Sequence, residues 1–250
     1  MMNLILLGSM GIAIECLEWL LTRPDFRIAG VVCSREPMSA WRKTIKDRNM
    51  LEVAEDKGIP ILDVNDLQHV QADIGVSVRF HKVLRRTHLN RFKLGVINLH
   101  GAPLPEMRGS MCDAAAIMEG RKEYGTSLHW MNERVDAGDI IDVKRFPIEP
   151  QHTVYDLFER CNRIGLELMK QYLPQIAAGK AVSTPQDIIA AEMGVTPQTY
   201  KAEDVRACKE ITPDTQSDQI WNVARAFQFP GHEPAYIRSG SGKIYVSIQG

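Results

Sequence analysis

The segment 98–109 contains the densest group of residues able to do chemistry, and reads Asn-Leu-His-Gly-Ala-Pro-Leu-Pro-Glu-Met-Arg-Gly. Asn98 and His100 are two residues apart, so on a strand their side chains leave the same face. Amide N–H groups suit the oxygen of a tetrahedral intermediate, and an imidazole with a pKa near neutrality can move or support a proton. The two side chains can therefore converge on one reacting atom.

A carboxylate beside this imidazole would orient it and raise its basicity. Asp136 is the candidate, because the following Ala137-Gly138 gives its loop the freedom to approach. Asp139 lies close enough in sequence to be a rival. Spacing alone leaves the choice between the two carboxylates open.

Other readings apply to these residues and their neighbours. An isolated Asn-x-His motif more often caps a strand and bonds to the following turn. His129 and Trp130 lie in a predicted strand and are interpreted as packing residues, since no partner is apparent. Arg108 could hold an anionic phosphate with its planar guanidinium, or could fix the loop through an ion pair.

Short apolar runs alternate with helix-length stretches over the first hundred residues, a pattern that predicts parallel strands joined by helices. We expect an α/β fold with a Rossmann-like, mostly parallel twisted sheet and flanking helices. Ligands bind at the carboxyl ends of such strands, where Asn98 and His100 lie. The turn 8–11 lacks the full G-x-G-x-x-G pattern, so NAD binding is not expected. The predicted strands are 3–7, 28–33, 59–62, 73–78 and 95–100.

An amphipathic helix that begins near Thr153 is expected to close the main domain. After Gly179 the pattern weakens until a helix at 217–227 and a terminal strand at 243–248. The predicted organisation is a core at 1–179 and a small C-terminal extension at 180–250, made of a helix and a β-hairpin.

Composition narrows the class of protein. The 250 residues include 30 Lys and Arg against 31 Asp and Glu, and a net charge of -1 argues against a nucleic-acid or acidic-membrane surface. The first residues lack the basic start of a signal peptide, so we expect a cytoplasmic protein. The five cysteines are widely separated without a C-x-x-C pair, which indicates neither a disulfide framework nor a zinc site.

The motif Asn98-Leu99-His100, followed by L-P-x-x-R-G and later by V-D-A-G-D-I-I, resembles the signature of the folate-dependent formyltransferase family. The resemblance covers most of residues 1–145. It implies that Asn98, His100 and Asp136 are the catalytic residues. The implied reaction moves a formyl group from N10-formyltetrahydrofolate to an amine, with Asn98 and protonated His100 stabilising the oxyanion and Asp136 assisting proton transfer. No metal is implied.

The resemblance also implies where the ligands bind. The pterin is expected against the main chain of two loops, with the cofactor-binding residues Arg79, Phe80, His81, Val83, Leu84, Val135, Gly138 and Asp139. Substrate is expected at Gly8, Ser9, Met10, Gly11, Pro105, Met107, Arg108 and Gly109. The family loop commonly reads H-P-S-L-L-P, whereas this chain has H-G-A-P-L-P, which loses a serine hydroxyl and moves a proline by two places.

Length and the C-terminal segment indicate a subfamily. Glycinamide ribonucleotide enzymes resemble the core alone, and methionyl-tRNA enzymes add a basic β-barrel that the segment after Gly179 is too short to supply. Residues 211–246 resemble the end of nucleotide-sugar N-formyltransferases. The implied acceptor is the amino group of a nucleotide-linked amino-dideoxy sugar, in a route to surface polysaccharide, and a homodimer is one expectation. The alternatives are a small free amine as acceptor, such as an amino acid or a ribonucleotide amine, or a non-catalytic folate-binding module.

Overall fold

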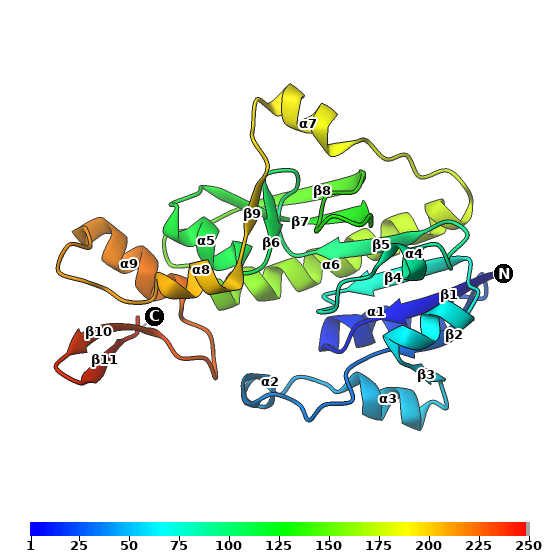
Figure 1. The fold of residues 1–250 in the computed structure, drawn as a ribbon, viewed down its shortest axis with the longest axis horizontal. Coiled ribbons are helices and arrows are strands. Elements are labelled where there is room, and N and C mark those ends of the chain that lie inside the picture. The colour runs from blue at the N-terminus through cyan, green and yellow to red at the C-terminus, as the bar shows by residue number, and fades with distance from the viewer. Residues whose placement is uncertain (249–250) are drawn as a thin grey trace.

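The computed structural model describes residues 1–248. A seven-stranded sheet, ordered β3-β2-β1-β4-β5-β7-β8, runs through the molecule (Figure 1). The pairs from β3 to β5 are parallel, whereas β5–β7 and β7–β8 are antiparallel. The predicted mostly parallel, Rossmann-like fold is thereby confirmed. The strands are β1 (Met2–Leu7), β2 (Phe26–Val32), β3 (Ile61–Leu62), β4 (Ile74–Val78), β5 (Val96–His100), β7 (Glu123–Trp130) and β8 (Ile140–Pro147).

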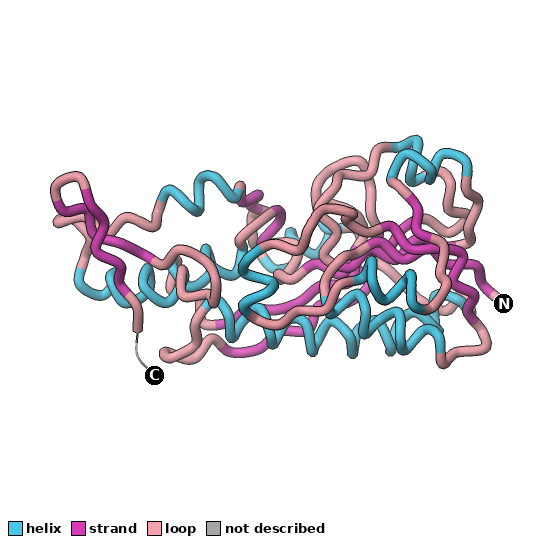
Figure 2. Tube along the Cα trace, turned by 90° about the horizontal axis from the view of Figure 1, so that it is seen from below, coloured by secondary structure: helices cyan, strands magenta, loops and turns pink. Residues whose placement is uncertain are grey.

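Both faces of the central strands are buried, as expected for parallel strands that read as continuous apolar runs. Leu4 and Leu6 of β1 belong to one buried cluster, and Ile5 and Leu7 belong to a second cluster on the opposite face. Helices and loops cover the sheet on both faces (Figure 2). The first helices are α1 (Gly11–Leu21), α2 (Ala40–Thr44), α3 (Met50–Asp56), the 3-10 helix η1 (Val64–His69), α4 (Arg86–Leu89) and α5 (Cys112–Met118).

The helix α6 (Val154–Ala177) is the predicted amphipathic helix that closes the core. Its start is fixed by a capping box, in which the side chains of Thr153 and Asp156 bond reciprocally to each other's main-chain N–H groups. Gly165 allows the helix to approach the sheet closely, because a Cβ there would lie 2.5 Å from Leu99 Cδ2. The helix therefore packs directly behind the strand that carries Asn98 and His100.

The segment after Gly179 returns to the core. Thr184 bridges to Ile140, and β9 (Gln198–Tyr200) pairs in parallel with β6 (Met107–Gly109). The predicted C-terminal helix and hairpin are present as α9 (Ser217–Ala226), β10 (Ala235–Ser239) and β11 (Gly242–Val246). The segment also contains α7 (Gln186–Met193) and α8 (Ala202–Ala207). No helix described between residues 1 and 248 is long and apolar enough to span a bilayer.

Candidate active site

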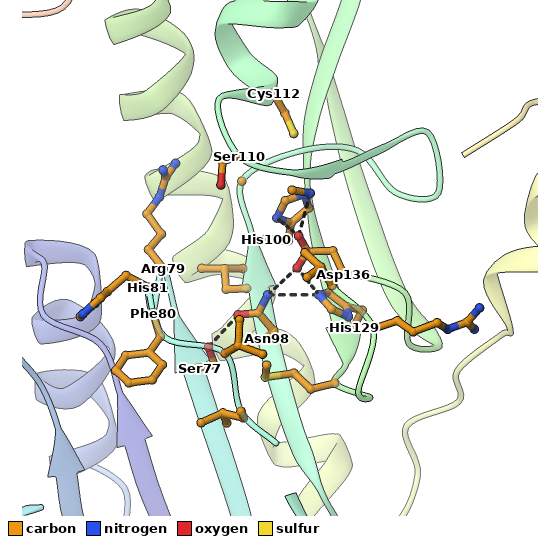
Figure 3. A pocket seen from close by; sticks show the side chains of 18 of the residues that line it. Ser77, Arg79, Phe80, His81, Asn98, His100, Ser110, Cys112, His129 and Asp136 are labelled. Carbon is orange, nitrogen blue, oxygen red and sulfur yellow. Dashed lines mark hydrogen bonds and ion pairs between the residues drawn. The ribbon is translucent and has the colours of Figure 1, made fainter. Parts of the chain in front are cut away.

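A cavity of about 500 Å³ opens beside the ends of β4 and β5 (Figure 3). Asn98 and His100 point into it from β5, and Ser77 points into it from β4. Two loops complete its walls, one running from Arg79 to Leu84 and the other from Met131 to Asp136. Its remaining lining residues are Leu99, Gly101, Gly109, Ser110, Met111, Cys112, Asp113, Tyr124 and His129.

Asn98 is held in one orientation by its neighbours. The Ser77 hydroxyl donates to Asn98 Oδ1 at 2.7 Å. The amide Nδ2 lies 3.1 Å from His129 Nε2 and 3.4 Å from Asp136 Oδ1. A flipped amide would turn its oxygen toward the Asp136 carboxylate, so the N–H groups must face the carboxylate and the cavity.

His100 is buried with acceptors on both sides of its ring. Its Nε2 lies 2.9 Å from the Met107 carbonyl oxygen, which can only accept, so Nε2 carries a proton and donates it. Nδ1 lies 3.6 Å from Asp136 Oδ2. Burial lowers the pKa of His100 and outweighs the nearby Asp136 charge that raises it, with His129 and Arg79 lowering it further. In the ligand-free protein His100 is therefore mainly neutral at pH 7, with Nδ1 as its basic atom.

Asp136 lies on the loop between β7 and β8, with a left-handed main chain at φ +46°. Burial raises the pKa of its carboxyl, but the combined effects of His100, His129 and the Gly109 N–H hold that pKa well below its usual range. The Gly109 N–H donates to Oδ2 at 2.9 Å. The carboxylate is consequently ionised at neutral pH and faces both imidazoles.

His129 also belongs to this cluster, although the sequence favoured a packing role for it. Its register on β7 places it directly opposite Asn98 of β5. Its Nδ1–H donates to the Trp130 carbonyl at 2.8 Å, and its Nε2 lies 3.1 Å from Asn98 Nδ2 and 3.6 Å from Asp136 Oδ1. Asn98 and His129 are 31 positions apart in the chain, so their contact follows from the pairing of β5 with β7 and not from local sequence.

The loop after His100 has Ala102 where the family commonly has a serine, and a hydroxyl from another strand lies beside it. Ser127 lies on β7, and its hydroxyl donates to the Ala102 carbonyl at 2.7 Å and accepts from the Leu104 N–H at 2.9 Å. The main chain of this loop is thus hydrogen-bonded in the absence of a side-chain hydroxyl at position 102. Tyr124 adds a further bond, since its hydroxyl donates to the Gly101 carbonyl at 2.6 Å.

The predicted cofactor-binding residues divide into two groups. Arg79, Phe80, His81, Val83, Leu84 and Val135 line the cavity. Gly138 lies outside it, packed so tightly that a Cβ would come 1.9 Å from the Trp130 carbonyl oxygen. Asp139, the rival carboxylate, is exposed and lines a separate cavity with Gln186.

Most of the predicted substrate-binding residues lie outside the main cavity. Gly109 lines it, and Met107 contributes only the carbonyl that binds His100. Arg108 donates through Nε and Nη2 to Gln186 Oε1 and lines the second cavity. Pro105 and the turn Gly8-Ser9-Met10-Gly11 line neither cavity. The structure therefore offers other polar residues for an acceptor, among them Ser110, Asp113 and Tyr124.

The arrangement as a whole fits addition to a carbonyl carbon. Asn98 offers N–H donors, His100 offers a basic nitrogen, and Asp136 supplies a fixed negative charge beside that nitrogen. Between residues 1 and 248 there is no group of three or more His, Cys, Asp or Glu side chains arranged to hold a metal ion.

The comparisons with known proteins agree with this chemistry. The family model described as formyl transferase matches residues 29–173. Over 196 residues the chain is 28% identical to a methionyl-tRNA formyltransferase of Listeria innocua, a match that covers 75% of this chain and 62% of that relative. The chain thus spans less than two thirds of that relative's length.

Two solved structures share the fold over most of the chain. A 4-N formyltransferase from Francisella tularensis superposes with a TM-score of 0.82 at 16% identity, over 99% of this chain and 97% of the other. An N-formyltransferase from Helicobacter canadensis, solved in complex with folinic acid and dTDP-3-aminofucose, gives a TM-score of 0.76 at 23% identity, over 92% of this chain and 81% of that one.

Proposed function

We propose that this chain, which belongs to the formyl transferase family, moves a formyl group from N10-formyltetrahydrofolate to the amino group of a nucleotide-linked amino-dideoxy sugar. The observation that carries the proposal is the convergence of Asn98, His100 and Asp136 on one cavity, with Asp136 Oδ2 3.6 Å from His100 Nδ1. We also propose that the enzyme is cytoplasmic and acts in a route to surface polysaccharide.

The donor is proposed to bind at the apolar end of the cavity. Phe80, Val83 and Leu84 come from one loop, and Met131 and Val135 come from the facing loop. Val83 and Val135 are exposed apolar side chains at the mouth of the cavity. A planar pterin could lie between the two loops and bond to their main chain, while its formyl group points toward Asn98.

In the proposed reaction the amine nitrogen attacks the formyl carbon, and the carbonyl electron pair moves onto oxygen. Asn98 N–H stabilises this oxyanion. The amine nitrogen gives one proton to the Asp136–His100 pair, which becomes an imidazolium held between Asp136 and the Met107 carbonyl. The oxyanion collapses, the bond from the formyl carbon to N10 breaks, and the pair returns its proton to N10. No metal takes part in these steps.

The sugar acceptor is supported by the similarity of the fold to sugar N-formyltransferases, with TM-scores of 0.82 and 0.76. The 4-N formyltransferase aligns with 99% of this chain, and the N-formyltransferase solved with dTDP-3-aminofucose aligns with 92% of it. At 16% and 23% identity these structures show only that the fold is shared. The nucleotide and the sugar of the acceptor therefore have to be identified by experiment.

Methionyl-tRNA is a second candidate acceptor, and the similarity to the methionyl-tRNA formyltransferase of Listeria innocua favours it. The net charge of -1 speaks against it, because a tRNA surface needs clustered basic residues. A small free amine would use the same three residues and a different acceptor pocket. A non-catalytic folate-binding module would keep the donor loops without turnover.

The test is a transfer assay with several acceptors. The purified full chain is incubated with N10-formyltetrahydrofolate and, separately, with dTDP-linked amino sugars, UDP-linked amino sugars, glycinamide ribonucleotide, free amino acids and methionyl-tRNA. Mass spectrometry should show one added formyl group on an amino sugar nucleotide. Transfer only to methionyl-tRNA, or only to a small amine, would contradict the sugar acceptor and identify that molecule as the acceptor. Binding of folate without any transfer would support the non-catalytic folate-binding module.

A further inference from the structure

The reaction outlined above does not use the guanidinium of Arg79, which lines the cavity. Its side chain extends along the cavity wall toward the end at which Ser110 and Cys112 lie (Figure 3). Within residues 1–248, Arg79 forms no hydrogen bond and no ion pair with another side chain. A guanidinium offers five N–H donors in a planar fork, so this cavity contains an unused set of donors.

The guanidinium is nevertheless held in place. It lies 4.4 Å from the ring centroid of Phe158, which is buried at the start of α6. On its other side it lies against Gly101, where a Cβ would come 2.7 Å from Arg79 Nη2. The main chain at Arg79 is left-handed, with φ +48°, in a region that few residues other than glycine adopt. Strained main chain of this kind is concentrated at binding sites.

The two ends of the cavity differ in character. Phe80, Val83 and Met131 give one end an apolar lining, and Lys82, Glu133 and Arg134 of the same two loops also line the cavity. The end that Arg79 reaches is lined by Ser110, Asp113 and Tyr124. Asp113 is also held there, and burial raises the pKa of its carboxyl while the Arg79 charge lowers it. The polar end is therefore suited to the acceptor, on the far side of Asn98 and His100 from the apolar loops.

We propose that the Arg79 side chain binds an anionic oxygen group of the acceptor, a phosphate or a carboxylate, and thereby places its amine beside Asn98 and His100. This assignment rests on the proposed function, and it names a feature of the substrate: the amine belongs to a molecule with a nearby negative charge. Arg79 is the first residue of the loop 79–84 that is proposed to bind the donor, so a single residue would contact both substrates.

Two substitutions isolate the guanidinium. Arg79→Met removes its charge and its donors, and Arg79→Lys keeps the charge without the planar fork. Both replacements carry a Cβ like arginine, so neither changes the strain at φ +48° much. Arg86→Met makes the same change at an exposed position of α4 that lines neither cavity, and serves as the matched control.

Anion binding is measured by calorimetry on the full chain saturated with 5-formyltetrahydrofolate. Inorganic pyrophosphate and acetate are the two probes, since they represent the phosphate and carboxylate sources. We expect Arg79→Met to weaken binding of the preferred probe by about tenfold to a hundredfold, as for loss of charge-assisted hydrogen bonds, with Arg79→Lys between it and the wild type. Arg86→Met should bind like the wild type.

Each outcome has a separate meaning. Equal binding by the wild type and Arg79→Met, or no binding of either probe to the wild type, would overturn the anion site. Preference for pyrophosphate would indicate a phosphate of the acceptor, and preference for acetate would indicate a carboxylate. A wild type that binds the probe through Arg79 but transfers formyl to no acceptor would keep the anion site and reject the proposed function.

Discussion

At the scale of single residues, Asp136 is held in place by contacts with three other residues of the site. Its carboxylate accepts from the Gly109 N–H at 2.9 Å and lies 3.6 Å from one nitrogen of each imidazole, His100 and His129. Its side chain is 14% exposed. In the proposed reaction a fixed charge of this kind would stabilise the protonated imidazole without reorganisation of solvent.

The first prediction concerns Asp136→Asn, which removes this charge with little change in size. Asparagine tolerates the left-handed main chain at this position, so the loop should keep its shape. We expect kcat to fall by about a hundredfold to a thousandfold, while binding of 5-formyltetrahydrofolate stays near its wild-type value. Steady-state kinetics and calorimetry measure the two effects.

Asp139→Asn is the matched control, because Asp139 is the exposed carboxylate three residues further along the chain. It should turn over like the wild type. If Asp139→Asn lost activity and Asp136→Asn kept it, the assignment of the carboxylate would be reversed.

The second prediction concerns stability and pH at His100. Burial lowers the pKa of this imidazole below 6.5, so folding disfavours its protonated form. The contribution of neutral His100 to the free energy of unfolding is therefore fully present above its pKa in the unfolded chain. It is lost as pH falls from 6.5 through the pKa of His100 in the folded protein. The stabilising contribution of ionised Asp136 is also lost on acidification, but only below the ordinary pKa of its carboxyl, 3.8. Acidification from pH 7 to pH 5 should therefore destabilise the protein partly through His100.

His100→Gln tests this directly, since a glutamine amide can still donate to the Met107 carbonyl and does not titrate. Urea unfolding at neutral pH and at about pH 5 should show a smaller loss of unfolding free energy in the variant than in the wild type. His81 and His232 also have lowered pKa values from burial, and they remain in both proteins as a common background. Equal losses in the two proteins would contradict the prediction.

Sequence reasoning identified part of this site and left part of it open, for a physical reason. The spacing of Asn98 and His100 places both on one face of a strand, and the structure has that arrangement. The choice between Asp136 and Asp139 depended on how a loop folds, which spacing does not encode. His129 and Ser77 lie beside Asn98 through strand pairing with β7 and β4, and pairing between distant strands is not a local property.

At the scale of elements, the alternation of apolar runs predicted the parallel strands from β1 to β5 and the helix α6. It did not predict β6 and β9, three residues each, which form a separate two-stranded parallel sheet. Such short strands have too few residues for a periodic pattern. Their pairing matters for the site, because β6 contains the Met107 carbonyl and the Gly109 N–H that contact His100 and Asp136.

The third prediction concerns Gln186, the first residue of α7, which connects this helix to the Asp136 loop. Its Nε2 donates to the main-chain carbonyls of Asp136 and Gly138 at 2.8 and 2.7 Å, and its Oε1 accepts from Arg108. The side chain is 3% exposed. Gln186→Met fills nearly the same space and removes the partner of a buried carbonyl, a partly buried carbonyl and the Arg108 guanidinium.

We expect this variant to lose about 1–3 kcal/mol of unfolding free energy, the usual cost of buried polar groups left unsatisfied. Its kcat should also fall, because the carboxylate of Asp136 would be held less firmly beside His100. Urea unfolding and steady-state kinetics measure the two effects. Gln171→Met, at an exposed position of α6, is the control, and an equal change in both variants would show that Gln186 does not position the loop.

At the scale of the whole molecule, the predicted boundary at Gly179 falls in the turn after α6, and the division into core and extension stays a proposal. The segment beyond it shares a buried cluster with the core. Tyr200, Ile211 and Phe227 pack in this cluster with Cys112 and Tyr124. Sequence alone indicated a weakly patterned extension, because apolar residues that pack on a distant partner need no periodicity of their own.

The C-terminal hairpin also presents an apolar surface outward. Ile237 of β10 and Ile244 of β11 are directly opposite each other in the ladder and are 40% and 57% exposed. Tyr245, the next residue of β11, is 54% exposed on the opposite face of the hairpin. Exposed apolar groups that gather on one element are typical of a surface that meets another protein. We expect this surface to bind a second copy of the chain and so to form a homodimer.

The fourth prediction is therefore that the protein forms a dimer through this hairpin and that Ile244→Asp separates it into monomers. A carboxylate at the centre of an apolar interface would lose its hydration without gaining a partner, which costs far more than the lost side-chain contacts. Light scattering coupled to size-exclusion chromatography should report twice the chain mass of 28.2 kDa for the wild type and the single mass for the variant. Ser241→Asp adds the same charge in the exposed turn of the hairpin and should remain dimeric. A wild type that elutes as a monomer at all concentrations would reject the hairpin as a dimer interface.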